Sequence, residues 1–168
     1  MAQLKRRDLR IAVMQVLYAH EMSKDPVDKI KKDLLPEIKE EESRDFVNQL
    51  IELTLKDEEM LDKMILEKVV NWELERMALI DKILLRMGIT ELMNFPEIPP
   101  KVSINEAIDI AKEYCTRNSG KFVNGILDAV LDDLKKANKL NKTGRGLLNL
   151  KKKEGKPQPK KQSQPLQN

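Results

Sequence analysis

The sequence contains a single cysteine, Cys115, and a single histidine, His20, among its 168 residues. One cysteine cannot form a disulfide within the chain, and the two side chains together are too few for a structural zinc site. A Cys/His catalytic dyad is conceivable from this pair, but a buried structural cysteine and a histidine near a helix end account for the two residues more simply. We therefore expect neither a metal site nor a nucleophilic catalytic centre.

Glycine and long apolar runs are also scarce. The six glycines match neither a phosphate-binding loop nor a dinucleotide-binding fingerprint, so no nucleotide cofactor is expected. There is no apolar N-terminal run and no apolar stretch of membrane-spanning length, which predicts a cytoplasmic protein without membrane contact. Carboxylates are numerous, but none forms a privileged catalytic pair. These absences favour a binding protein over an enzyme.

The composition that is present is typical of helices. Charged residues make up 35% of the chain and aromatics only 4%, and apolar residues recur at helical spacing without a long period-2 run. The sequence therefore predicts an all-α fold, a compact bundle of about seven helices. We expect helices over about 4–22, 26–35, 43–70, 79–92, 103–114 and 119–134, with a short helix or turn over 72–77.

Local patterns predict where two of these helices begin. Ser103-Ile104-Asn105-Glu106 has the spacing of a capping box, and Val102 and Ala107 are placed for a hydrophobic staple, so a helix is expected to begin at Ser103. Ser43 is expected to cap a long helix that continues to about residue 70 without interruption. Beyond about residue 138 the helical pattern is lost. Residues 139–168 are predicted to be a disordered, basic low-complexity tail, of which 151–168 in particular lacks the apolar content to fold.

The formal net charge of +3 conceals a gradient along the chain. Residues 1–10 carry a net charge of +3, residues 11–134 carry −10, and residues 135–150 and 151–168 carry +5 each. A polyanion is therefore expected to meet the two ends of the chain, and a basic protein its acidic body.

The first basic feature is the segment Lys5-Arg6-Arg7-Asp8-Leu9-Arg10. On a helix Arg6 and Arg10 are i, i+4 neighbours and Arg7 lies beside them, so three guanidinium groups can reach adjacent phosphates. A charged, frayed helix start is the alternative interpretation. The Arg cluster is a candidate nucleic-acid contact.

The second feature is Asn118-Ser119-Gly120-Lys121-Phe122, which we expect at a helix N-terminus. Free backbone N–H groups and the helix dipole favour a phosphate there, Lys121 adds charge, and Phe122 can stack on a base. The alternative is an ordinary cap with Phe122 in the core. The lysine-rich tail is weaker evidence, because it could add non-specific affinity or only solubility.

Several segments, in this order and spacing, strongly resemble the NusB transcription antitermination family. They are Ala12–Tyr18, Trp72-Glu73-Leu74-Glu75-Arg76, Ile83–Met87, Val102–Ala107 and Ser119–Leu127. The resemblance covers about residues 5–137. It implies two helical subdomains, about 1–77 and 78–138, within a domain of residues 1–138. It also implies binding of the boxA element of ribosomal RNA leader transcripts together with NusE, a small-subunit ribosomal protein, so that RNA polymerase reads through terminators.

The resemblance also implies roles for single residues. The matching RNA-facing positions are Arg6, Arg7, Arg10, Lys121 and Phe122, with Asn118 beside them where the family tends to place an acid. Tyr18 and Asp81 match positions on the NusE-facing side. The positions that match the family's scaffold are Arg86, Asn105, Glu106, Asn124 and Gly125.

Other functions remain open from the sequence. A NusB-like domain also precedes the catalytic domain of some ribosomal RNA cytosine methyltransferases, and this chain ends before such a domain could begin. A helical adaptor that binds proteins through its acidic body and ignores RNA is a second alternative. The free protein could be a monomer or a homodimer that hides its RNA face.

Overall fold

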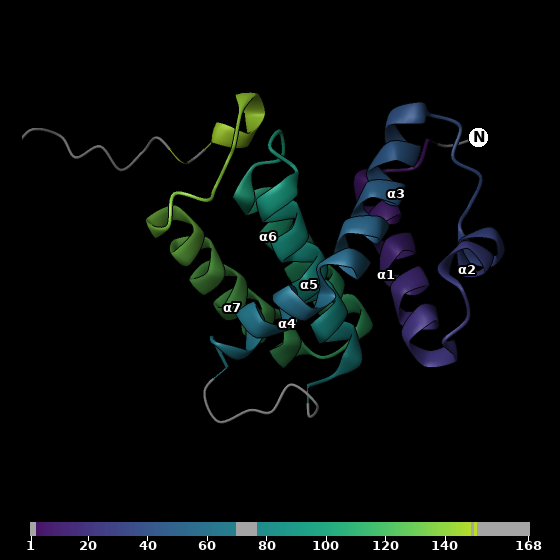
Figure 1. The fold of residues 1–168 in the computed structure, drawn as a ribbon, viewed down its shortest axis with the longest axis horizontal. Coiled ribbons are helices and arrows are strands. Elements are labelled where there is room, and N and C mark those ends of the chain that lie inside the picture. The colour runs from purple at the N-terminus through teal and green to yellow at the C-terminus, as the bar shows by residue number, and fades with distance from the viewer. Residues whose placement is uncertain (1–2, 70–76, 149, 151–168) are drawn as a thin grey trace, which may run out of the picture.

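A computed structural model describes residues 3–69, 77–148 and 150. These residues form helices and no strand, which confirms the all-α prediction (Figure 1). The elements are α1 Arg6–Ser23, α2 Val27–Leu34, α3 Glu41–Lys56, α4 Glu58–Leu66, α5 Leu79–Asn94, α6 Pro100–Tyr114, α7 Arg117–Lys136 and the short 3-10 helix η2 Gly144–Leu147.

Helix α5 is the centre of the bundle because it is apolar on more than one face. It contacts α1, α3, α4, α6 and α7, and residues 83–92 along it are all buried. Helices α1, α2 and α3 lie on one side of α5, and α6 and α7 lie on the other (Figure 1). The buried side chains of both groups belong to one continuous hydrophobic cluster. The whole described chain therefore shares a single core.

A buried ion pair fastens α4 to α5. Arg86 of α5 donates from Nε and Nη2 to the two carboxylate oxygens of Asp62 at 2.6 and 2.8 Å, and Nη2 also lies 3.2 Å from Glu58. The geometry is a bidentate fork, the strongest arrangement for an arginine and a carboxylate. This pairing supports the scaffold role that the resemblance implies for Arg86.

The predicted start of α6 at Ser103 is wrong. The helix begins three residues earlier, with Pro99 as cap and Pro100 at the first helical position, which the fixed φ of proline favours. Ser103 is buried in the first turn, where its hydroxyl donates to Glu91 at 3.1 Å and so does not cap the helix. Val102 is 42% exposed and forms no staple.

The predicted single helix over 43–70 is two helices in the structure. Asp57, with φ −100° and ψ 15°, ends α3 and begins α4. The helix also begins before Ser43, since Glu40 is its cap and the Ser43 hydroxyl donates to Glu40. One apolar stripe nevertheless continues through Thr54 and Leu61, which is why the periodicity alone showed no break.

The chain packs on the bundle for ten residues beyond the predicted limit at 138. We call residues 139–148 the strap. Lys142 is 7% exposed and donates to the carbonyl oxygens of Glu91 and Phe95 at 3.2 and 2.8 Å, and the Thr143 N–H donates to the Pro96 carbonyl at 3.0 Å. The backbone at the end of α5 therefore holds the strap. The predicted tail over 151–168, and the predicted turn over 72–77 except Met77, lie outside the described residues.

Candidate nucleic-acid interface

The first part of the candidate interface is the start of α1, where Arg7 reaches across to α6. Arg7 Nε and Nη2 donate to the two carboxylate oxygens of Glu106 at 3.0 Å each, and Nη2 also donates to Asp109 at 2.7 Å. The Arg7 side chain remains 44% exposed. Solvent reaches the guanidinium and screens these pairs, so a phosphate can compete for its exposed edge.

Arg6 lies beside it against an aromatic ring. Its guanidinium carbon is 4.1 Å from the centroid of Phe46, and Nη2 donates to Glu42 of α3 at 3.2 Å. The stack holds the plane of the guanidinium in place while the side chain remains 41% exposed. A fixed, partly exposed guanidinium edge is suited to bidentate binding of phosphate.

Arg10 does not lie with Arg6 and Arg7 at the surface, which corrects the predicted cluster of three. It is 3% exposed, and its Nε and Nη2 donate to the buried carboxylate of Glu91 on α5 at 2.7–3.2 Å. Arg10 shares its side of α1 with Val13 and Met14, both buried in the core. The guanidinium is therefore an internal link between α1 and α5.

The second part is the start of α7, which begins earlier than predicted. Thr116 caps the helix: its Oγ1 accepts from the Ser119 N–H at 3.3 Å, and Ser119 Oγ accepts from the Thr116 N–H at 3.4 Å. Lys121 and Phe122 consequently lie in the second turn, where the Lys121 backbone N–H belongs to the helix ladder. A phosphate site on the backbone of residues 119–121 is therefore ruled out.

The side chains at the start of α7 are still placed for surface contacts. Asn118 and Lys121 are exposed, and Phe122 is half-buried at the edge of the core. The sequence left two roles open for Phe122, stacking on a base or packing in the core. In the structure one part of the side chain packs on the core and the rest is accessible. Lys121 places a positive charge at the surface of this second turn.

Helix α6 joins the two parts. Asp109, which binds Arg7, is three residues from Lys112, so the two side chains lie on one side of the helix. The methylenes of Lys112 cross Gly120 of α7 so closely that a Cβ on Gly120 would lie 2.8 Å from Lys112 Cε. The starts of α1 and α7 therefore border the same side of α6. We missed Lys112 from the sequence, although its spacing from Glu106 and Asp109 was the available signal.

Tyr18 and Asp81, the two residues assigned to a protein partner, occupy different environments. Tyr18 is 39% exposed, and Met22, one turn later on α1, is 64% exposed. Asp81 is 6% exposed and accepts from Ser119 Oγ at 2.9 Å, so it does not face a partner and instead supports the start of α7. Burial raises the pKa of Asp81, and hydrogen bonds from Ser119 and Cys115 offset part of that rise.

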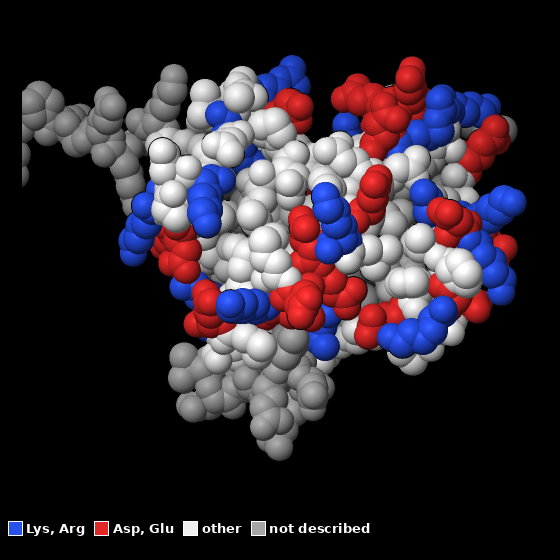
Figure 2. All heavy atoms as spheres, in the orientation of Figure 1, with Lys and Arg blue, Asp and Glu red and all other residues white. Residues whose placement is uncertain are grey.

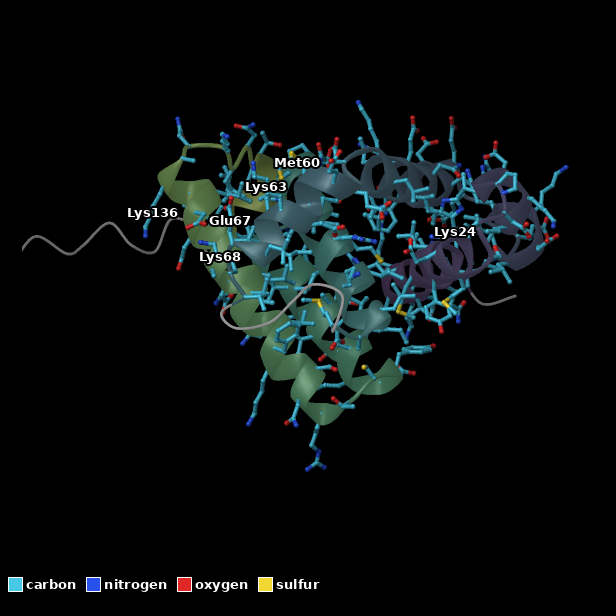
Figure 3. The ribbon with its side chains drawn as sticks, turned by 60° about the horizontal axis from the view of Figure 1, so that its bottom comes forward. Lys24, Met60, Lys63, Glu67, Lys68 and Lys136 are labelled. Atoms are coloured by element: carbon cyan, nitrogen blue, oxygen red, sulfur yellow. The ribbon has the colours of Figure 1, made fainter. Side chains whose placement is uncertain are left out.

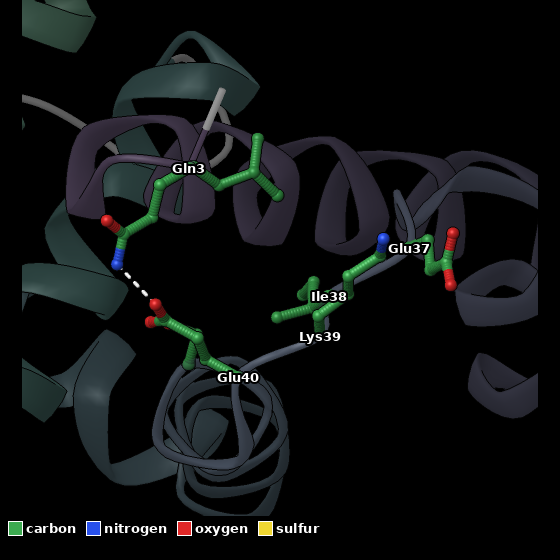
Figure 4. A pocket seen from close by; sticks show the side chains of 7 residues that line it. Gln3, Glu37, Ile38, Lys39 and Glu40 are labelled. Atoms are coloured by element: carbon green, nitrogen blue, oxygen red, sulfur yellow. Dashed lines mark hydrogen bonds between the residues drawn. The ribbon is translucent and has the colours of Figure 1, made fainter. Parts of the chain in front are cut away.

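On the face that Figure 2 shows, basic and acidic side chains are intermingled. Where the end of α4 meets α7, Lys68 pairs with Asp133, and Lys63 and Glu67 lie one helical turn apart (Figure 3). A hollow of about 700 Å³ between the N-terminal segment and residues 37–40 is crossed by a contact from Gln3 to Glu40 (Figure 4). The hollow is lined by Glu37 and Glu40 with Lys39 as the one lysine among its lining residues.

The NusB family model matches residues 7–132, which is most of the chain. The chain belongs to the NusB family. The transcription antitermination protein NusB of Salinibacter ruber is 48% identical over 147 residues, covering 86% of this chain and 92% of that protein. The corresponding NusB of Chloroherpeton thalassium is 46% identical over 149 residues, covering 88% of this chain and 71% of that protein.

Solved structures share the NusB fold. A structure of T. maritima NusB matches with a TM-score of 0.73 at 34% identity, over 79% of this chain and 94% of that one. A chain from the crystal structure of the antitermination factors NusB and NusE in complex with dsRNA matches with a TM-score of 0.69 at 24% identity. That match covers 76% of this chain and 96% of the other. At 24% identity, the match to the NusB–NusE–dsRNA structure shows a shared fold.

The NusB family match ends at residue 132, so the strap lies beyond it. Over the described ranges no helix is long and apolar enough to cross a membrane, and no cluster of metal-ligating side chains occurs. The features that remain for function are thus the basic side of α6, the exposed side chains at the end of α1, and the strap.

Proposed function

We propose that this chain is a cytoplasmic transcription antitermination factor. It binds boxA-type single-stranded RNA of ribosomal RNA leader transcripts together with NusE, and helps RNA polymerase read through terminators. Curated NusB relatives that are transcription antitermination proteins support this function. The single observation that carries the RNA site is a set of basic side chains gathered around α6. Arg7 binds Glu106 and Asp109, Arg6 lines a groove with Val102 and Glu106, Lys112 lies on α6 itself, and exposed Lys121 follows Gly120, which packs against Lys112.

RNA phosphates can replace the carboxylates that bind Arg6 and Arg7 in the free protein. Arg7 is held by two carboxylates and Arg6 by one, all in partly exposed pairs. Such pairs are weak, whereas each phosphate contact also releases counterions from the RNA. Lys121 enters the interface with its ammonium exposed. Asn118 stands next to it without the negative charge that an acid would bring to a bound phosphate.

Arg10 and Phe122 have supporting roles in this proposal. Arg10 positions α1 through its buried pair with Glu91 and does not meet the RNA directly. The half-buried ring of Phe122 gives a base a partial stacking surface beside Lys121.

The surface proposed for NusE is the exposed end of α1. Tyr18 and Met22 supply adjacent apolar area on the acidic body of the chain, and a ribosomal protein is expected to be basic. Opposite charges steer the association, so it is expected to be faster at low salt.

Photochemical crosslinking tests the RNA site. A single-stranded boxA-type RNA carrying a photoreactive base is crosslinked to the full chain, and the attached peptides are identified by mass spectrometry. Crosslinks in α1, α6 and the first turns of α7 are expected. Crosslinks confined to α2 and α4, or none above the level of a control protein, would favour the alternative of a protein-binding adaptor without RNA affinity.

A further inference from the structure

The strap has a geometry that requires its own explanation. Lys142 binds the carbonyl oxygens at the end of α5, and the strap approaches Pro96 so closely that a Cβ on Gly146 would lie 1.9 Å from the Pro96 carbonyl oxygen. The 3-10 helix η2 follows, and its Arg145 is exposed. The strap therefore holds Arg145 at a defined place on the bundle.

Arg145 lies in the wall of a groove that is also lined by residues of α1. The groove has a volume of about 720 Å³, and Arg6, Phe46, Val102, Arg145 and Leu148 are among the residues that line it. Val102 is 42% exposed and Leu148 is 58% exposed, so the wall offers apolar surface beside the guanidinium groups of Arg6 and Arg145; Arg10, paired with Glu91, lies at the base of the same groove. A groove with cations and apolar surface is suited to a single nucleic-acid strand.

Acidic side chains also line the groove. The charge that a ligand meets there depends on which of these acids are paired with cations. Glu42 pairs with Arg6, Glu106 pairs with Arg7, and the charge of Glu97 acts on Lys142. Asp45 completes the acidic set. Arg145 forms no ion pair with any described acid and is the cation in this wall that is free to take a phosphate.

The groove continues the interface already described. Val102 in the first turn of α6 lines the groove with Arg145, Glu106 binds Arg7 one turn later, and Lys112 in the last turns lies over the start of α7. From Val102 to Lys112 the helix rises about 15 Å. The basic groups therefore follow α6 from one end to the other.

We propose that the strap extends the RNA-binding surface of this chain, with Arg145 binding a backbone phosphate of single-stranded RNA that runs along α6 from Lys121 through Arg7 and Arg6 into the groove. This inference rests on the proposed RNA-binding function and adds a contact beyond the region matched by the NusB family model. It predicts that the chain engages a longer RNA than α1 and α7 alone could cover.

The test compares three RNAs and three forms of the full chain. A short boxA-type oligonucleotide and versions extended by several nucleotides at either end are titrated into the parent, Arg145→Ala and Lys63→Ala. Lys63 is an exposed lysine of α4 outside the groove and serves as the matched control (Figure 3). One extension is expected to strengthen binding to the parent and to Lys63→Ala by about threefold to fivefold.

Arg145→Ala is expected to lose that gain, to bind the short RNA as the parent does, and to show a log–log salt slope smaller by about 0.7 with the extended RNA. Equal binding of the extended RNA by Arg145→Ala and the parent would overturn the inference and leave the proposed function intact. So would a change in self-association of Arg145→Ala with RNA binding unaltered, since the groove would then be a protein interface. Failure of the parent to bind any of the RNAs would overturn the proposed function and this inference together.

Discussion

Three arginines within one and a half turns of α1 meet three different environments. Arg7 is held at the surface by half-buried Glu106 and exposed Asp109 of α6, Arg6 is stacked on Phe46, and Arg10 is enclosed with Glu91. The charge is the same in each case, but the energy of each interaction depends on the solvent around it. Exposed pairs are weak and exchangeable, while a buried charge that loses its partner is strongly destabilising.

This contrast predicts different effects of removing Arg7 and Arg10. Arg10→Ala leaves the carboxylate of Glu91 buried without its partner and is expected to lower the free energy of unfolding by about 3–5 kcal/mol. Arg7→Ala breaks only exposed pairs and is expected to lower it by at most about 1 kcal/mol. Urea unfolding followed by circular dichroism measures both. Comparable losses in the two variants would show that the Arg10 pair is not enclosed as described.

A second prediction at this scale concerns the pH dependence due to Asp81. Because burial raises the pKa of this carboxyl in the folded chain, its contribution to stability is fully present below the ordinary aspartate pKa and is lost as the pH rises through the folded-state value. Asp81→Asn does not titrate. The free energy of unfolding of the parent relative to Asp81→Asn is therefore expected to fall as the pH is raised from about 4 towards 7. A difference that is constant, or that grows with pH, would contradict the burial of Asp81.

Among the elements, the boundaries show which features the sequence could predict. The apolar periodicity located α1, α2, α5, α6 and α7 to within a few residues, and it covered α3 and α4 with one continuous prediction. It could not reveal the break at Asp57, because one apolar stripe continues across it. It also could not fix the start of α6, because Pro100 and the capping pattern at Ser103 each indicate a helix start. The strap was missed because a lysine such as Lys142 is usually solvated. Lys142 is buried here because its ammonium donates to backbone carbonyls that lie some 50 positions earlier in the chain.

Two glycines provide a matched test of how the strap is held. Gly146→Ala places a methyl group 1.9 Å from the Pro96 carbonyl oxygen and is expected to destabilise the strap, lowering the free energy of unfolding by about 1–3 kcal/mol. Gly125→Ala, in an exposed turn of α7 with nothing within 4 Å, is expected to raise it by up to about 1 kcal/mol. Hydrogen exchange resolved by segment distinguishes the effects, because only Gly146→Ala should speed exchange in residues 139–148. Unchanged exchange there would mean that the strap does not pack on Pro96.

Over the whole molecule, the residues that make up the proposed RNA site are set by the fold more than by the local sequence. Arg6, Arg7 and Lys121 could be chosen from charge alone, because they lie at the starts of amphipathic helices. Arg10 could not be set apart from them, since its partner Glu91 is 81 positions away. Lys112 and Arg145 join the surface only once α6 and the strap are placed in the bundle.

The protein-binding side is tested with two tyrosines of similar exposure. Tyr18→Asp puts a carboxylate into the apolar surface at the end of α1 and is expected to weaken NusE binding by about tenfold or more. Tyr114→Asp, at a site 37% exposed on α6, is the control for a new surface charge and is expected to leave NusE affinity unchanged. Calorimetric titration of NusE into each variant gives the affinities, and circular dichroism checks that helical content is retained. An undiminished affinity in Tyr18→Asp would move the NusE interface elsewhere.

The central claim is that single-stranded RNA is bound through the basic side chains bordering α6. The most direct measurement is the salt dependence of boxA-type RNA affinity for the parent and for the triple variant Arg6→Ala, Arg7→Ala, Lys121→Ala. Each lost phosphate contact removes about 0.7 from the log–log slope, so the triple variant is expected to bind more weakly at every salt concentration with a slope smaller by about 2. The same affinity and the same slope in the triple variant and the parent would contradict the claim.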